Sequence, residues 1–372
     1  MNGNSVAENH SLSNGDAKLF ELLDGAQGDF LEVIPEVEDR KRIAGDPTRP
    51  VEDRLEALED VFESEVGDTP LTRARNLERE VGIRQLFLKF EGANPTGTQK
   101  DRIAFAQVMD ALRRGFDTIT MATCGNYGAA VALAASVAGL RCIVCIPESY
   151  HTRRVKEIID LGAEIVRVPG DYESAVEMSR ELAAQNEYYD ANPGSANTSL
   201  QLRAYGEIAY EIYDELRDAP AVVAVPVSNG TTLAGIYKGF VSLYRRGKTS
   251  RVPRVVAGSS YRKNPIVQAF LRRAPSCLDL RPQLIRETSI NEPLVNWHSI
   301  DGDLALAAIR NTRGWAANAT DKSMLAFSKL LREKEGLHVL PASTAGLIAL
   351  LDLHSHEPLP GDRYVVVLTG RR

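Results

Sequence analysis

QLFLKFEGANPTGTQKDRIAFAQVMDALRR, residues 85–114, is the stretch that decides the fold. Its first six residues are mostly apolar and predict a strand, whereas residues 101–114 repeat apolar positions with the period of a helix. Between them lies a turn rich in Gly, Pro, Asn and Thr, and Lys100 stands where the helix begins. A strand, a turn and an amphipathic helix form the first half of a βαβ unit.

The same alternation of short β-branched runs and longer helical patterns continues to the end of the chain. Several runs are continuously apolar, which is typical of parallel strands covered by helices on both faces. We therefore predict an α/β, doubly wound architecture, and 372 residues are enough for two cores. The strand candidates are QLFLKF (85–90), TITMAT (118–123), CIVCIP (142–147), EIVRVP (164–169), AVVAVPV (221–227), RVVAGS (254–259) and YVVVLTG (364–370).

Composition narrows the possible partners and the compartment. The formal net charge of −6 gives nucleic acid no general attraction, and the sequence shows neither a secretory leader nor an apolar run long enough for a bilayer. A cytoplasmic protein is expected. The C-x-x-C of Cys142 and Cys145 lies inside a strand candidate, so we interpret it as core packing. The histidine spacing supports no metal site.

The N-terminal residues 1–64 differ from the rest. About the first fifteen are polar and rich in Gly, Asn and Ser, and we expect them to be disordered. Residues up to about 64 carry a charged helical pattern. We predict a helical arm or cap here.

Ligands of open α/β sheets bind at the carboxyl ends of strands, so the turns after the strand candidates are the places to search. Lys100 opens a helix, where the positive end of the helix dipole lowers an amine's pKa and favours the neutral nucleophile. A solvated lysine in the first helical turn is an equal alternative. A P-loop is disfavoured, because Thr98 and Gln99 intervene after Gly97 where Lys-Ser/Thr is required.

Three further turns have polar groups at the same edge. Each could also be an ordinary strand-end turn. ATCGNYGAA (122–130) offers backbone N–H groups and the Thr123 hydroxyl to a carboxylate, and Asn126 could donate its amide to a phenolic oxygen. SNGTTLAG (228–235) could receive a phosphate dianion at a helix start. Thr369, at the end of the last strand candidate, could hydrogen-bond a pyridine nitrogen without protonating it.

Together these four turns supply the contacts that pyridoxal 5′-phosphate and its amino-acid adduct need. The chain from about Asp68 to its end resembles the fold-type II (tryptophan-synthase-β-like) pyridoxal-phosphate family, and within it the threonine synthases most. The segments that carry the resemblance are NPTGTQKDRI, TCGNY, SNGTT, INEPLVNW, LPASTAGL and VVVLTG.

The resemblance implies a cofactor site. Lys100 would form the Schiff base with pyridoxal phosphate, Asn126 would contact its O3′, and Thr369 would partner the pyridine nitrogen. The phosphate ligands would be Ser228, Asn229, Gly230, Thr231 and Thr232. Residues 65–105 and 201–372 would form a large cofactor-binding domain and residues 106–200 a small mobile one. A homodimer is also implied.

On the substrate side, Thr123, Cys124 and Tyr127 would line the pocket for the α-carboxylate of a small amino acid. Arg102 is the nearest cation for an anionic leaving group, and an exposed arginine at a helix start is the alternative. Gln99 stands where the family has Phe, and Leu340 where it has Glu.

We expect a lyase or synthase, with threonine synthase activity as the best reading. The alternatives are a β-replacing synthase or dehydratase acting on serine, O-phosphoserine, O-acetylserine or threonine, and a catalytically silent cofactor-binding regulatory subunit. A nicotinamide-binding oxidoreductase is disfavoured because no G-x-G-x-x-G follows the strands.

Overall fold

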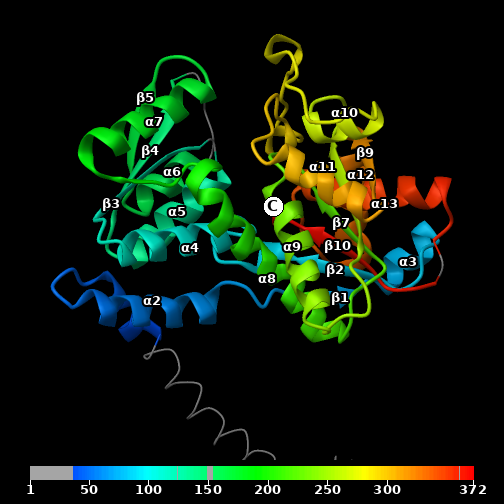
Figure 1. Cartoon of the computed structure of the whole chain (residues 1–372), viewed down its shortest axis with the longest axis horizontal. Helices are drawn as coiled ribbons and strands as arrows, with labels where there is room; N and C mark the ends of the chain where they lie inside the picture. Colours follow the sequence, from blue (N-terminus) through cyan, green and yellow to red (C-terminus); the bar gives the residue numbers. More distant parts are fainter. Residues whose placement is uncertain (1–36, 124, 149–153, 360) are drawn as a thin grey trace, which may run out of the picture.

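The computed structural model describes residues 37–123, 125–148, 154–359 and 361–372. Figure 1 shows two lobes, each built on its own sheet with helices packed around it. Neighbouring strands are parallel throughout, except at one edge of the larger sheet. The predicted α/β architecture of two doubly wound domains with mostly parallel sheets is thereby confirmed.

The larger sheet has the strand order β1-β2-β10-β7-β8-β9. Its antiparallel edge strand is β1, and β10 lies between β2 and β7 although it comes last in the chain. The register of β10 on β2 sets Leu368 opposite Phe90, so the segment after β10 emerges beside the turn that contains Lys100. The strands are β1 (Leu71–Arg73), β2 (Leu86–Phe90), β7 (Val222–Pro226), β8 (Arg254–Ser260), β9 (Trp315–Ala319) and β10 (Tyr364–Leu368).

The smaller sheet has the order β5-β4-β3-β6 and is parallel throughout. Its strands all fall within the predicted range 106–200, and those of the larger sheet fall within 65–105 and 201–372. The exact domain boundaries and the mobility of the small domain remain predictions. The strands are β3 (Thr118–Ala122), β4 (Arg141–Pro147), β5 (Glu164–Val168) and β6 (Tyr189–Asp190).

Helices cover both faces of each sheet, which explains the continuously apolar strands. In β7, Val222 and Ala224 belong to one core with residues of α13, whereas Val223 and Val225 belong to another with residues of α8 and α9. The helices are α2 (Val51–Glu65), α3 (Arg75–Val81), α4 (Lys100–Arg113), α5 (Asn126–Val137), α6 (Arg154–Asp160), α7 (Tyr172–Asn186), α8 (Thr198–Leu216), α9 (Thr231–Arg245), α10 (Pro265–Leu271), α11 (Gly302–Asn311), α12 (Asp321–Glu335) and α13 (Ala345–His356).

The C-x-x-C pair lies in β4, with both thiols buried. Cys142 belongs to the core shared with α5 and Cys145 to the core under α7, so the two side chains pack on opposite faces of the sheet. Burial raises the pKa of Cys142 to about 12 and that of Cys145 to about 11. Both residues are core residues, as predicted. Within the described ranges, no group of three potential ligands could hold a metal ion.

The N-terminal arm is helical where it is described and packs beneath the smaller lobe (Figure 1). Its anchor is the buried Arg54, whose Nη2 donates to the carbonyl oxygen of Ala138 at 2.7 Å and whose Nε donates to that of Ala44 at 3.1 Å. The predicted disorder of the first fifteen residues lies outside the described part. No helix in the described part is long and apolar enough to span a membrane.

Helices α8 and α9 pack with their backbones in close approach. A Cβ added at Gly239 of α9 would lie 2.5 Å from the carbonyl oxygen of Gly206 in α8 and 2.7 Å from the Cβ of Ala209. Glycine is therefore required by the packing rather than by its dihedral angles. This contact matters for the site, because α9 begins directly after the turn at residues 228–230.

We expect Gly239→Ala to lower the free energy of unfolding by about 1–3 kcal/mol, since the two helices must separate to admit one methyl group. Urea denaturation of the apo-protein measures this. Lys238→Ala, at an exposed position of the same helix, is the control and should change stability by less than about 0.5 kcal/mol. Equal effects of the two substitutions would contradict the packing argument.

Candidate active site

A cleft lies where the starts of α4, α5 and α9 meet the carboxyl ends of β7 and β10. It encloses about 710 Å³ of space, its open mouth included. The three predicted turns after β2, β7 and β10 all reach this cleft, and Asn126 from the turn after β3 joins them. The lining residues are Gln99, Lys100, Asn126, Pro226, Val227, Ser228, Asn229, Gly230, Thr231, Thr232, Leu233, Pro293, Leu294, Leu340, Ala342, Ser343 and Thr369.

Lys100 is the first residue of α4, and its backbone N–H donates to the Thr98 hydroxyl at 3.2 Å. Its Nζ lies 5.9 Å from the ring centroids of both Tyr127 and Tyr205. Burial of the amine lowers the pKa of Lys100 to about 8. The sequence predicted a lowered pKa from the helix start, whereas the cause in the structure is loss of solvent around Nζ.

The Lys100 turn is held by the segment that follows β10. The backbone N–H of Gln99 donates to the carbonyl oxygen of Thr369 at 3.1 Å, and that of Arg371 donates to the carbonyl oxygen of Gly97 at 2.9 Å. The Arg371 guanidinium adds a bond to the carbonyl oxygen of Pro95 at 2.9 Å. The residues nearest the C-terminus therefore fix the backbone that presents the lysine.

The buried side chain of Asp101, next to Lys100, also stabilises this turn by hydrogen bonds. Its carboxylate is fully buried and accepts bonds from the Thr96 backbone N–H at 3.0 Å and the Thr96 hydroxyl at 2.7 Å. Burial raises the pKa of Asp101 to about 6, although both bonds from Thr96 counter that rise. Asp101 thus closes the loop immediately before the helix.

The predicted phosphate turn, residues 228–232, joins β7 to α9. Gly230 has φ +92°, and a Cβ there would lie 2.8 Å from the Cβ of Ala305 and 2.9 Å from the carbonyl oxygen of Asp301. Only glycine combines this left-handed backbone with so little space. The N–H groups at the start of α9 lack carbonyl partners in their own helix and are suited to an anion.

Neighbouring segments hold this turn from behind. The side chains of Asn264 and Ser299 donate to the carbonyl oxygen of Ser228 at 2.9 and 3.0 Å. The hydroxyl of Thr231 donates to Asp301 Oδ2 at 2.6 Å, so it has no proton left for a phosphate. The backbone N–H of Thr231 is therefore the donor that this residue has available for an anion.

Thr369 directly follows β10 and lines the cleft, and its hydroxyl is hydrogen-bonded to Ser343 at 3.1 Å. Ser343 is fully buried and also contacts the carbonyl oxygen of Gly370. Sequence reasoning missed this residue. It lies in LPASTAGL, which we used only as a mark of family resemblance and not as a source of site residues.

Of the predicted substrate residues that the structure describes, Thr123, Tyr127 and Arg102, none is among those that line the cleft. The Tyr127 hydroxyl donates to the carbonyl oxygen of Ala191 at 2.7 Å and contacts Gln107 within the smaller lobe, so only the ring faces Lys100. Tyr127 therefore does not offer its hydroxyl to a carboxylate. The Thr123 hydroxyl accepts from the Gly125 N–H at 3.3 Å. Cys124 lies outside the described residues.

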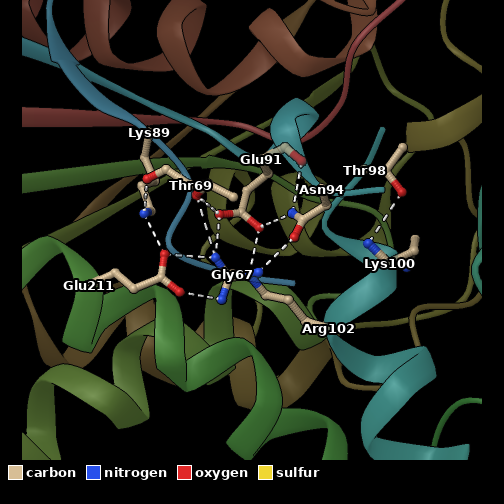
Figure 2. A network of polar contacts seen from close by, with 9 residues as sticks. All are labelled: Gly67, Thr69, Lys89, Glu91, Asn94, Thr98, Lys100, Arg102 and Glu211. Atoms are coloured by element: carbon tan, nitrogen blue, oxygen red, sulfur yellow. Dashed lines mark hydrogen bonds and ion pairs between the residues drawn. The ribbon is translucent and has the colours of Figure 1, made fainter. Parts of the chain in front are cut away.

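Arg102 does not line the cleft. Its side chain is 3% exposed and lies between the carboxylates of Glu91 and Glu211, apart from Lys100 (Figure 2). The guanidinium bonds Glu91 at 2.7 and 2.8 Å and Glu211 at 2.6 and 2.8 Å. Burial lowers the pKa of Arg102, but the two carboxylates outweigh burial and raise it. Neither predicted reading of Arg102, leaving-group contact or exposed helix start, fits this geometry.

The network around Arg102 extends to Lys89, which is 1% exposed and contacts Glu211 and the carbonyl oxygen of Thr69 (Figure 2). Burial alone would raise the pKa of Glu211, but the bonds and charges of Arg102 and Lys89 lower it to about 2. Two cations thus face two carboxylates in the interior. We define Lys89, Glu91, Arg102 and Glu211 as the buried ion network.

Comparison with known families gives one match over most of the chain. Residues 62–370 match the family described as "Pyridoxal-phosphate dependent enzyme". Among curated relatives, a threonine synthase of Methanocaldococcus jannaschii is 33% identical over 305 residues, 82% of this chain and 74% of the relative. A threonine synthase of Halalkalibacterium halodurans is 33% identical over 307 residues, 82% of each chain.

Solved structures support the same fold at lower sequence identity. The processed form of threonine deaminase isoform 2 from Solanum lycopersicum superimposes with a TM-score of 0.69 and 16% identity, covering 88% of this chain and 92% of its own. Maize serine racemase gives a TM-score of 0.70 and 19% identity, covering 85% of this chain and 92% of its own.

Lys100 should react as an unusually acidic lysine. When apo-protein is mixed with pyridoxal phosphate, reduced with borohydride and mapped by mass, we expect the label on Lys100. The labelling rate should rise with pH around pH 8 and level off above it, because only the neutral amine reacts and its pKa is lowered from the ordinary value of about 10.4. A rate that still climbs above pH 10, or a label on another lysine, would contradict the assignment.

Arg102→Met should leave the carboxylates of Glu91 and Glu211 buried with Lys89 as their remaining cation in the network. We expect the free energy of unfolding to fall by about 3–5 kcal/mol. Arg141→Met is the matched control, because Arg141 makes a similar two-pronged pair with Glu164 where both side chains are about half exposed. That substitution should cost less than about 1 kcal/mol, measured by urea denaturation.

Proposed function

The chain belongs to the family of pyridoxal-phosphate-dependent enzymes, and on that premise we propose that it catalyses elimination and replacement on a small amino acid. The specific reaction we propose is that of a threonine synthase, which converts O-phosphohomoserine and water to threonine and phosphate. The curated relatives that are named threonine synthase support the proposal. The observation that carries it is the meeting of a desolvated Lys100 amine, an anion-binding turn and a neutral hydroxyl in one cleft.

The residues of the cleft fit pyridoxal phosphate by their chemistry. Residues 228–232 offer backbone N–H groups to a phosphate. Gly230 has no side chain, and a Cβ at this position would clash with its neighbours. Asn126 brings an amide and Thr369 a neutral hydroxyl, which suit a phenolic oxygen and a pyridine nitrogen. Lys100 would hold the cofactor through its amine, which faces the same cleft.

When bound, the cofactor withdraws electrons from the substrate's Cα and so makes its proton removable. The Lys100 amine can take that proton, because an amine with a pKa of about 8 is partly neutral at physiological pH. The same pKa allows the protonated amine to give the proton back. The buried rings of Tyr127 and Tyr205 near Nζ keep bulk water from this amine. The Thr123 hydroxyl is proposed to hold the substrate's α-carboxylate.

The Thr369–Ser343 pair bears on the type of reaction. Both groups are neutral hydroxyls, so neither places a negative charge beside the ring nitrogen to hold a proton there. A ring that stays unprotonated is a weaker electron sink, which suits elimination and replacement better than transamination. This supports a lyase or synthase rather than an aminotransferase.

Two cleft residues favour a second candidate within the same family. Gln99 and Leu340 line the cleft where the family that the chain resembles has Phe and Glu. A changed lining changes which side chain of a substrate is accepted. The second candidate is a β-replacing synthase or dehydratase acting on serine, O-phosphoserine, O-acetylserine or threonine.

Product analysis separates these functions. Purified holoenzyme given O-phosphohomoserine should release equal amounts of phosphate and threonine, and Lys100→Ala should lose at least about 10²-fold in rate because the base is gone. Pyruvate or 2-oxobutyrate from serine or threonine, or a thioether from O-acetylserine and a thiol, would instead establish the second candidate. Cofactor absorbance without turnover of any of these amino acids would favour a silent regulatory subunit.

A further inference from the structure

Arg154, at the start of α6, is bonded to two of the turns at the cleft, the turn after β2 and the turn after β3. Its Nε donates to Asn126 Oδ1 at 3.1 Å, and its Nη2 donates to the carbonyl oxygen of Thr96 at 3.1 Å. Its Nη1 pairs with Glu157 at 2.6 and 2.8 Å, one turn further along α6. All three nitrogens of the planar guanidinium are thus engaged, and each faces a different acceptor group.

The contact with Asn126 fixes which end of its amide is which. A guanidinium has only donors, so only the oxygen of the amide can face it. The Nδ2 end therefore lies on the other branch of the amide, and Asn126 itself lines the cleft. Without a neighbour that can only donate, either end of an asparagine amide could turn toward a ligand.

The contact with Thr96 reaches the Lys100 turn. The N–H and hydroxyl of Thr96 both bind the buried carboxylate of Asp101, and Asp101 is the neighbour of Lys100 in α4. Arg154 adds a third bond to Thr96 by donating to its carbonyl oxygen. One side chain of the smaller lobe is therefore bonded to two of the four turns that carry predicted cofactor contacts.

We infer that Arg154 is a positioning residue of the active site, which orients the Asn126 amide so that its N–H₂ group is presented to the phenolic oxygen of the cofactor. The inference rests on the proposed contact between Asn126 and that oxygen. A donor at this oxygen favours its ionised form, so Arg154 acts on the electronic state of the bound cofactor through Asn126. Sequence reasoning gave Arg154 no role.

Cofactor affinity tests the inference in a double-mutant cycle. We expect Arg154→Met and Asn126→Ala each to raise the dissociation constant of pyridoxal phosphate by about 10-fold, the ratio expected for one lost hydrogen bond. The double variant should bind no more weakly than Asn126→Ala alone, because Arg154 acts through Asn126. Fold-changes that multiply would overturn the inference, as would wild-type affinity in Arg154→Met.

The pH dependence of the bound cofactor's absorbance gives a second readout that a merely structural role would not move. In Arg154→Met the midpoint should shift to higher pH, since the ionised oxygen loses its donor. Asn126→Asp should shift it in the same direction while keeping an acceptor for Arg154, because the carboxylate offers no donor and adds a negative charge beside the phenolic oxygen. An unmoved midpoint in Arg154→Met would overturn the inference.

Controls separate this inference from the proposed function. Arg141→Met, which removes an exposed arginine–glutamate pair of the same lobe, should leave affinity and midpoint unchanged. If Arg154→Met does not fold, Arg154→Lys replaces it, because a single ammonium cannot reproduce both bonds, and wild-type binding there overturns the inference. A borohydride label away from Lys100 would overturn the proposed function itself.

Discussion

The buried guanidinium of Arg102 is the constraint on which the site depends. It links the segment directly after β2 through Glu91, the start of α4 through its own backbone, and the C-terminal half of α8 through Glu211. A charge in the interior is tolerated only when its partners are in place, so these three segments must come together in one arrangement. Lys100 lies two residues away, and the position of its amine follows from that arrangement.

Much of the fold could be predicted because the strand runs are strongly apolar and separated by helical patterns. The rule that parallel strands end at one edge also predicted that these turns lie together, and Lys100, Asn126, residues 228–232 and Thr369 do line one cleft. Burial of the Cys142–Cys145 pair followed from the same reasoning. These features depend on the local sequence pattern and on the direction of the strands, and both can be deduced from the sequence.

Side-chain direction could not be predicted, because the partner in each case comes from a distant segment. Arg102 faces Glu211, Tyr127 faces Ala191, and Thr231 faces Asp301, at separations of 109, 64 and 70 residues. A residue at the right turn can therefore point its polar atom away from the ligand. Ser343 and Arg154 were missed for the same reason, since only their distant partners Thr369 and Asn126 show what they do.

The position of β10 affects the order in which the chain can fold during its synthesis. This strand follows all the others in the chain, yet it lies between β2 and β7, and its extension bonds the Lys100 turn. During translation, the lysine turn and the phosphate turn are made long before the strand that unites them. A nascent chain therefore holds two separate halves of a site. The bonds between the Lys100 turn and the segment after β10 join residues far apart in the sequence, so they can form only after this last strand has been made.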